Sequence, residues 1–112
     1  MSGPVLRIFE ARTKPGHAEE LLENFATTSA AVVTGEPGNK GYIFGRSVAG
    51  DDDTVLFISL WESLDAIQAR FDDDWQVSYM PDGYVEIIEE HSVRHFDMDG
   101  GWHPDKLQDS GL

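Results

Sequence analysis

The stretch TVLFISLWESLDAIQARF, residues 54–71, decides the fold. Six of its first eight residues are aliphatic or aromatic, which are side chains that suit a pleated surface, so Thr54 to Trp61 predicts a buried strand. Ser63 follows, and its hydroxyl oxygen can accept a hydrogen bond from a backbone amide in the first turn of a helix. Apolar residues then recur at helical spacing up to Phe71, which predicts a helix. Trp61 therefore lies at a strand end, immediately before a helix.

The composition indicates one small domain with few classes of partner. A chain of 112 residues with 40% hydrophobic residues can build one core. The formal charge of −13 opposes approach to phosphate backbones and anionic lipid, so we expect neither nucleic acid nor a membrane as a partner. The absence of cysteine excludes disulfides, thiolate metal sites and a cysteine nucleophile. Nothing resembles a signal peptide or a membrane span of about 20 residues, so a cytoplasmic protein is the expectation.

Hydrophobic periodicity and turn residues predict the remaining elements around residues 54–71. Lys14-Pro15-Gly16 and the glycines between 35 and 38 interrupt the pattern, and residues 49–53 form a short turn between two strands that we expect to pair as a hairpin. Residues 99–112 read as a polar C-terminal tail, so the domain is expected to cover residues 1–98. In chain order, the predicted elements are a strand over 5–13, a helix over 17–34, a strand over 41–48, a short helix over 81–90 and a strand over 91–98.

This order predicts an α+β fold of the ferredoxin-like, split βαβ type, with a four-stranded antiparallel sheet. Two helices cover one face of such a sheet. The strands at 5–13 and 54–61 are apolar on both faces, and a chain this short has no further element to cover the second face. A second copy can cover it, so we expect a homodimer.

The sequence resembles the antibiotic biosynthesis monooxygenase-like proteins of the dimeric α+β barrel superfamily. The resemblance runs from about residue 5 to residue 98. It rests on the helix start at residues 14–17, on the Gly38 to Gly45 stretch, and on Leu60-Trp61-Glu62-Ser63 with Ala66 and Phe71. It implies that two sheets meet in a dimer and that each subunit holds a cavity between its sheet and its helices.

The resemblance also implies an activity, because some members oxidise aromatic phenols to quinones with dioxygen and no cofactor. Such an enzyme has only to bind the substrate, deprotonate it and exclude water. Trp61 matches a tryptophan that these members place in the cavity, whereas the asparagine that some carry four residues earlier is Phe57 here. Haem-degrading members carry an iron-ligating histidine about ten residues after the tryptophan, and Arg70 and Phe71 occupy those positions, so no cofactor is expected.

The candidate site residues are aromatic or basic side chains on the predicted sheet and near it. Trp61 and His91 are the catalytic candidates, since histidine can act as a general base near neutral pH. The substrate-binding candidates are Tyr42, Phe57, Tyr79, Tyr84 and Arg46.

No metal site is expected from these residues. His91 and His95 lie on one face of a strand but about 13 Å apart at roughly 3.3 Å per residue, so they cannot chelate one ion together. The triple-Asp runs at 51–53 and 72–74 lack the spacing of a calcium loop.

Three functions fit the sequence. The first is a monooxygenase that acts without a cofactor on a small aromatic or polyketide-like molecule. The second is a non-catalytic small-molecule binding or stress-related protein of the same fold, and the third is an isomerase or lyase with His91 as base.

Overall fold

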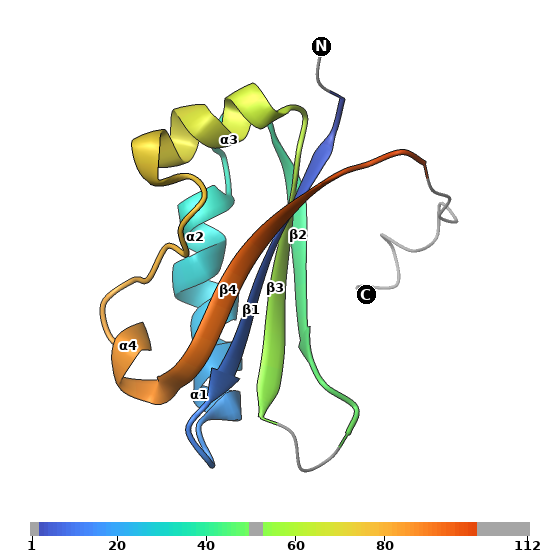
Figure 1. Ribbon diagram of the computed structural model, residues 1–112. Coiled ribbons are helices and arrows are strands. Elements are labelled where there is room, and N and C mark those ends of the chain that lie inside the picture. The colour runs from blue at the N-terminus through green and yellow to red at the C-terminus, as the bar shows by residue number, and fades with distance from the viewer. Residues whose placement is uncertain (1–2, 50–52, 101–112) are drawn as a thin grey trace.

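The computed structural model describes residues 3–49 and 53–100, which form one sheet with helices on one side (Figure 1). The predicted strands at 5–13 and 54–61 and the predicted helix at 64–71 have the expected bounds. In chain order the elements are β1 (Val5–Thr13), α1 (Ala18–Asn24), the π-helical turn η1 (Phe25–Ser29), α2 (Ala30–Val33), β2 (Asn39–Arg46), β3 (Thr54–Trp61), α3 (Leu64–Phe71), the 3₁₀ turn η2 (Asp72–Asp74), α4 (Tyr84–Ile87) and β4 (Ile88–Asp97).

The sheet has the strand order β2-β3-β1-β4, and every neighbouring pair is antiparallel. This is the predicted ferredoxin-like arrangement, in which two βαβ units interleave so that β1 and β3 become the central strands. The pair β2 and β3 forms the expected hairpin. The central strands β1 and β3 each pair with a strand on both sides.

The first helical stretch runs without a break through α1, η1 and α2, and its middle turn is wound as a π-helix. Ser63 caps α3 as the sequence predicts, since its hydroxyl oxygen accepts a hydrogen bond from the Ala66 amide at 3.2 Å. No helix in residues 3–49 and 53–100 is long and apolar enough to cross a bilayer.

The core lies between the sheet and the helices. Alternate residues of β1 and β3 are buried along this face, and Leu21, Phe25 and Ile67 from the helices are fully buried against them. The other face of the sheet has no helix over it (Figure 1). Its residues are the ones in between, such as Ile8 and Ile58, which pair across the central strands.

The bounds of the short helix, of the second strand and of the last strand differ from the prediction. The short helix predicted over 81–90 is only Tyr84–Ile87, because Ile88 is extended and residues 88–90 pair with the end of β1 across a bulge. The second strand is Asn39–Arg46 rather than 41–48, because its pairing with β3 runs from Asn39, opposite Trp61, to Arg46, opposite Val55. Of the predicted tail, residues 101–112 lie outside the described residues.

Candidate functional site

Three rows of side chains cross the sheet on the face that the helices cover. The pairing of neighbouring strands places the members of each row directly opposite one another, one from each strand. In strand order the rows are Tyr42–Ser59–Arg7–His95, then Phe44–Phe57–Phe9–Val93, then Arg46–Val55–Ala11–His91.

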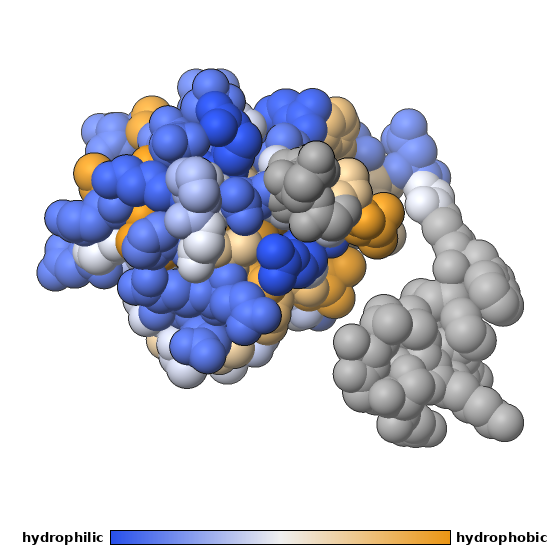
Figure 2. Space-filling view, turned by 90° about the horizontal axis from the view of Figure 1, so that it is seen from below, coloured by the Kyte–Doolittle hydropathy of each residue, from blue (hydrophilic) through white to orange (hydrophobic). Residues whose placement is uncertain are grey.

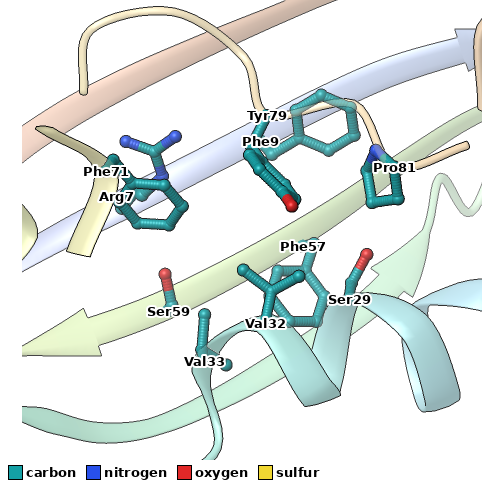
Figure 3. Close-up of a pocket in the computed structure, with 10 residues that line it drawn as sticks. All are labelled: Arg7, Phe9, Ser29, Val32, Val33, Phe57, Ser59, Phe71, Tyr79 and Pro81. Carbon is teal, nitrogen blue, oxygen red and sulfur yellow. The ribbon is translucent and has the colours of Figure 1, made fainter. Parts of the chain in front are cut away.

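A cavity of about 40 Å³ lies over the first two rows, between the sheet and the helices (Figure 3). The sheet provides a floor of one cation, one hydroxyl and two aromatic rings. The walls come from the helical stretch, from the end of α3 and from the loop before α4. The lining residues are Arg7, Phe9, Phe57 and Ser59 from the sheet, Ser29, Val32, Val33 and Phe71 from the helices, and Tyr79 and Pro81 from the loop.

Arg7 is a buried cation, only 5% exposed, in the middle of the sheet. Its Nη1 donates to the Trp75 carbonyl oxygen and its Nη2 to the Val77 carbonyl oxygen at 3.3 Å. Its guanidinium carbon lies 3.9 Å from the centre of the Phe71 ring, in cation–π geometry. Burial, with a smaller contribution from the charge of Arg70, lowers the pKa of Arg7 to about 10, so it is still protonated at neutral pH.

His95 is the neighbour of Arg7 on β4, with its Nε2 3.0 Å from Arg7 Nη1. A guanidinium can only donate, so Nε2 is the acceptor and the ring proton resides on Nδ1. Burial, together with the charge of Arg7, lowers the pKa of His95 to about 4. His95 is therefore neutral at physiological pH and adds no second charge to the row.

Ser59 lies opposite Arg7 on β3, and its buried hydroxyl oxygen accepts a 2.9 Å hydrogen bond from the Trp61 indole nitrogen. Because an indole N–H only donates, this bond leaves the hydroxyl proton of Ser59 available to another acceptor. Trp61 itself is fully buried, packs edge-on against Phe71 at 6.0 Å, and does not line the cavity. It supports two lining residues from behind.

Tyr79 and Pro81 form the wall that faces outwards. On their other side lies an open hollow of about 500 Å³, which shares Phe71 with the cavity and has Arg70 at its rim. In Figure 3 the Tyr79 hydroxyl points into the space above Phe57. Within the described part of the chain, the Tyr79 backbone makes no hydrogen bond to another backbone group.

Ser29, the last residue of the π-helical turn, places a second hydroxyl on the cavity. Its Oγ lies 2.6 Å from the hydroxyl of Tyr84, which also donates to the Asn24 carbonyl oxygen at 3.2 Å. Burial raises the pKa of Tyr84. Single π turns within α-helices are frequent at functional sites, because they redirect side chains by a fraction of a turn.

The candidate residues predicted from sequence occupy different positions around this cavity. Phe57 and Tyr79 line it. Tyr42 is stacked on Phe57 at a centroid distance of 5.3 Å, on the side of β2. Two others lie behind the lining residues: Trp61 behind Ser59, and Tyr84 behind Ser29.

His91 and Arg46 belong to the third row and lie outside the cavity. Both side chains are exposed, and His91 Nδ1 is 2.9 Å from the Ser78 hydroxyl. Across residues 3–49 and 53–100, no three potential metal ligands of the His, Asp or Glu type come together.

Arg7, Ser59 and His95 are the site residues that sequence reasoning missed. The signal was present in the alternation of β1 and β3. Alternate residues of a strand point to the same face of the sheet. Arg7 alternates with Val5 and Phe9, and Ser59 alternates with Phe57 and Trp61, so each places a polar side chain on an inward apolar face. A polar residue at an inward position needs a partner or a function.

The fold recurs in solved structures. MhuD from Mycobacterium tuberculosis, a haem degrader with two haems bound in its active site, is 22% identical, with a TM-score of 0.68 over 88% of this chain and 99% of that chain. A mutant of SnoaB from Streptomyces nogalater, a cofactor-independent oxygenase, is 16% identical, with a TM-score of 0.66 over 89% of this chain and 97% of that chain. At these identities the likeness shows the fold alone. The comparison with curated proteins found no match.

The model of the antibiotic biosynthesis monooxygenase family matches residues 4–74, more than half of the chain. The match runs from the start of β1 to the 3₁₀ turn after α3, so it includes the residues that form the floor and the helical walls of the cavity. The chain belongs to the antibiotic biosynthesis monooxygenase family.

Proposed function

We propose that the protein is a monooxygenase that oxidises a small aromatic or polyketide-like molecule with dioxygen in this cavity, without a prosthetic group. For a model substrate such as anthrone, the reaction gives anthraquinone and water: one oxygen atom enters the ring, and the other leaves with the two hydrogens of the oxidised carbon. The substrate supplies the electrons once it is deprotonated. The protein has to bind the ring, favour the deprotonated form and exclude water.

The observation that supports this proposal best is the aromatic lining of the cavity. Phe9 from β1, Phe57 from β3, Phe71 from α3 and Tyr79 from the loop before α4 contribute the rings, and Figure 3 shows them around one space. Flat side chains arranged in this way suit a flat ligand, because offset and edge-on ring contacts are favourable. The buried charge of Arg7 at one end favours an anionic form of such a ligand.

Substrate binding requires the cavity to enlarge, since 40 Å³ is far below the roughly 300 Å³ or more of ordinary ligand sites. Tyr79 and Pro81 separate it from the adjoining 500 Å³ hollow. Tyr79 is the residue whose rotation would join the two spaces, because its side chain is 48% exposed and forms the wall. We therefore propose that the substrate enters past Tyr79.

Two other functions compete with the proposal. Haem degradation, the activity of MhuD, fits less well because the position of the family's histidine ligand holds Arg70, whose Nε donates to the Val32 carbonyl oxygen at 2.9 Å. A binding protein without catalysis would bind the same aromatic molecules but consume no dioxygen. An isomerase or lyase with His91 as base is disfavoured, since His91 is exposed outside the cavity.

We also propose that two copies pair through the open face of the sheet. Figure 2 shows a mostly hydrophilic surface, with hydrophobic residues gathered on the right, the side that the helices leave uncovered. Ile43 is 55% exposed and Phe96 is 45% exposed on this face. A hollow of about 380 Å³ lies beside Ile43, Leu56 and Ile58. Exposed apolar residues that gather on one uncovered face are typical of an interface.

The test of the function measures dioxygen uptake and quinone formation from anthrone in air. The protein is first treated with a chelator to remove metal ions and is checked to be colourless. Val32→Phe narrows the cavity, and the matched control Val48→Phe adds the same ring at a fully exposed position. We expect the wild type and the control to consume one dioxygen per quinone, and Val32→Phe to lose at least tenfold in rate while remaining folded. A wild-type rate equal to that of buffer would refute catalysis, and equal rates in the two variants would refute the cavity.

A further inference from the structure

We propose that the cavity binds its ligand as an anion, with a carboxylate or phenolate oxygen held between the Arg7 guanidinium and the Ser59 hydroxyl. This inference deepens the proposed function and rests on it for the aromatic part of the ligand. It specifies the substrate class as aromatic acids, either carboxylic acids or phenols that bind ionised.

The first support is the charge balance around Arg7. Among the described residues no carboxylate pairs with Arg7, whereas Arg12, on the same strand but the other face, pairs with both Glu89 and Glu90. The protein carries 21 acidic residues, so acidic side chains are plentiful, yet none of those that the structure describes forms an ion pair with Arg7. A buried charge without a counter-ion is costly, and an anionic ligand would remove that cost.

The second support is the set of hydrogen-bond donors that face the cavity. Arg7 has five N–H groups, and its contacts in the described structure are two carbonyl oxygens and His95 Nε2, all through Nη1 and Nη2. The Nε–H and one Nη2–H remain for a ligand. Ser59 lies directly opposite Arg7 on the neighbouring strand. Its hydroxyl oxygen accepts from the Trp61 indole, so its hydroxyl proton remains to be donated to a ligand.

The third support is the absence of competing negative charge. The ten residues that line the cavity include no aspartate, glutamate or histidine. A second cation, Arg70, lies at the rim of the outer hollow, with its guanidinium carbon 5.0 Å from the centre of the same Phe71 ring that Arg7 stacks on. The outer hollow is also lined by Asp72, Asp74 and Asp82, so the charge changes from mixed in the hollow to positive in the cavity, where Arg7 is the one charged residue among the described lining residues.

The shape of the cavity assigns an orientation to the ligand. In Figure 3 Arg7 and Ser59 lie at one end, and Phe57, Val32 and Tyr79 surround the remaining space. An anionic oxygen at the first end places the attached ring among the apolar and aromatic groups. The site therefore fits an aromatic acid better than a neutral aromatic molecule or a sugar.

Titration of the ¹⁵N-labelled full chain, followed by NMR at constant ionic strength and pH 7.5, tests the inference with matched probes. Formate against formamide tests the anion site alone, since both are small enough for the cavity as it stands. 2-Naphthoate against 2-naphthylmethanol tests the carboxylate arm with a ring attached. 2-Naphthol tests the phenolate arm, because its absorbance reports ionisation on binding. The variants are Arg7→Met, Arg7→Lys and the control Arg12→Met, which removes the same charge from the opposite face.

We expect wild type and Arg12→Met to bind 2-naphthoate at least tenfold more tightly than 2-naphthylmethanol. The ratio should fall to about one in Arg7→Met and lie between these values in Arg7→Lys, which keeps the charge without the planar fork. If 2-naphthol binds in its ionised form, the natural ligand is a phenolate. If 2-naphthoate binds tightly and 2-naphthol does not, the natural ligand is a carboxylate.

A ratio that survives in Arg7→Met, or a wild type without preference for the anion, would overturn the inference. Formate binding that depends on Arg7, with no binding of any naphthalene probe, would keep the anion site and refute the aromatic substrate of the proposed function. Failure of formate as well as the naphthalene probes would overturn the anion site itself.

Discussion

Trp61 affects the cavity through its neighbours. Its indole N–H holds the Ser59 hydroxyl oxygen, and its ring packs on Phe71, whose own ring lies against the Arg7 guanidinium. Trp61 is thus a positioning residue in this structure. Its substitution should change both stability and ligand affinity, because one side chain is fully buried and orients two lining residues.

Trp61→Phe should lower the free energy of unfolding by about 1–3 kcal/mol, from the lost hydrogen bond and the void left by the smaller ring. A double-mutant cycle with Ser59→Ala isolates the bond, because each single variant breaks it. We expect a coupling of about 0.5–1.5 kcal/mol from denaturant unfolding. Strict additivity of the two variants would show that the Trp61–Ser59 bond is not formed in solution.

His95 should make stability depend on pH between about 4 and 6.5. Its pKa is lowered to about 4 in the folded protein from an ordinary value of 6.5, so in this window the unfolded chain binds more protons. Stability contributed by the neutral ring is therefore complete above pH 6.5 and is lost as the pH falls to 4. Because part of the ring faces solvent, we expect a loss of about 1–2 kcal/mol rather than the full ~3 kcal/mol of such a shift.

The measurement for His95 is denaturant unfolding from pH 4 to 7.5 for the wild type and His95→Gln, whose amide oxygen can still accept from Arg7. Acidic groups titrate in both proteins, so the difference curve isolates the histidine. A difference curve that is flat across this window would contradict the lowered pKa.

At the scale of elements, α3 packs closely against the start of β2 through Gly38. A Cβ added to Gly38 would lie 2.5 Å from the Ala66 Cβ. The carbonyl oxygen of Gly38 accepts a hydrogen bond from the Glu62 amide at 2.8 Å. Gly38 also has a φ of +86°. The residue must be glycine for both reasons, and the contact fixes where α3, and with it Phe71, sits over the sheet.

Gly38→Ala and Gly35→Ala separate these two reasons. Both glycines have positive φ, but a Cβ at Gly35 meets open space. Gly35→Ala should cost about 1–2 kcal/mol from backbone strain, and Gly38→Ala about 1–3 kcal/mol more from the clash with α3. Thermal unfolding of the two variants measures the difference. Equal losses would show that α3 does not pack on Gly38.

The elements themselves were largely predictable from sequence. The alternation at 5–13, the apolar run at 54–61 and the Ser63 cap identify β1, β3 and α3 with correct bounds, because these features are local. Residues 88–90 were assigned to a helix because Ile87 and Ile88 share helical spacing with Tyr84. Pairing with the end of β1 decides the conformation of Ile88, and a long-range pairing of this kind has no local signal.

The site was only partly predictable. Phe57 and Tyr79 were selected as aromatic residues of a cavity, and both line it. Arg7 was not selected from the sequence, although it shares the alternating positions of Val5 and Phe9, which place it inwards beside His95. This alternation alone was available in the sequence. The row that joins Arg7, Ser59 and His95 depends on the register of three strands, which only the assembled sheet provides.

At the scale of the whole molecule, the open face of the sheet predicts a dimer of 25 kDa, twice the chain mass of 12.5 kDa. Ile43→Lys places a charge on this face, and the control Val85→Lys places one on α4 at a position of similar exposure. Sedimentation at micromolar concentration should give a dimer for the wild type and the control and a shift towards monomer for Ile43→Lys. A wild type that sediments as a monomer would contradict the proposed interface.

The central claim is that the cavity between the sheet and the helices is the binding site, and intermolecular NOEs with bound 2-naphthoate test it most directly. We predict NOEs from the naphthalene protons to Phe57, Phe71 and Tyr79, with the carboxylate towards Arg7. NOEs to Ile43 and Ile58 on the open face instead, with none to the cavity residues, would contradict the claim.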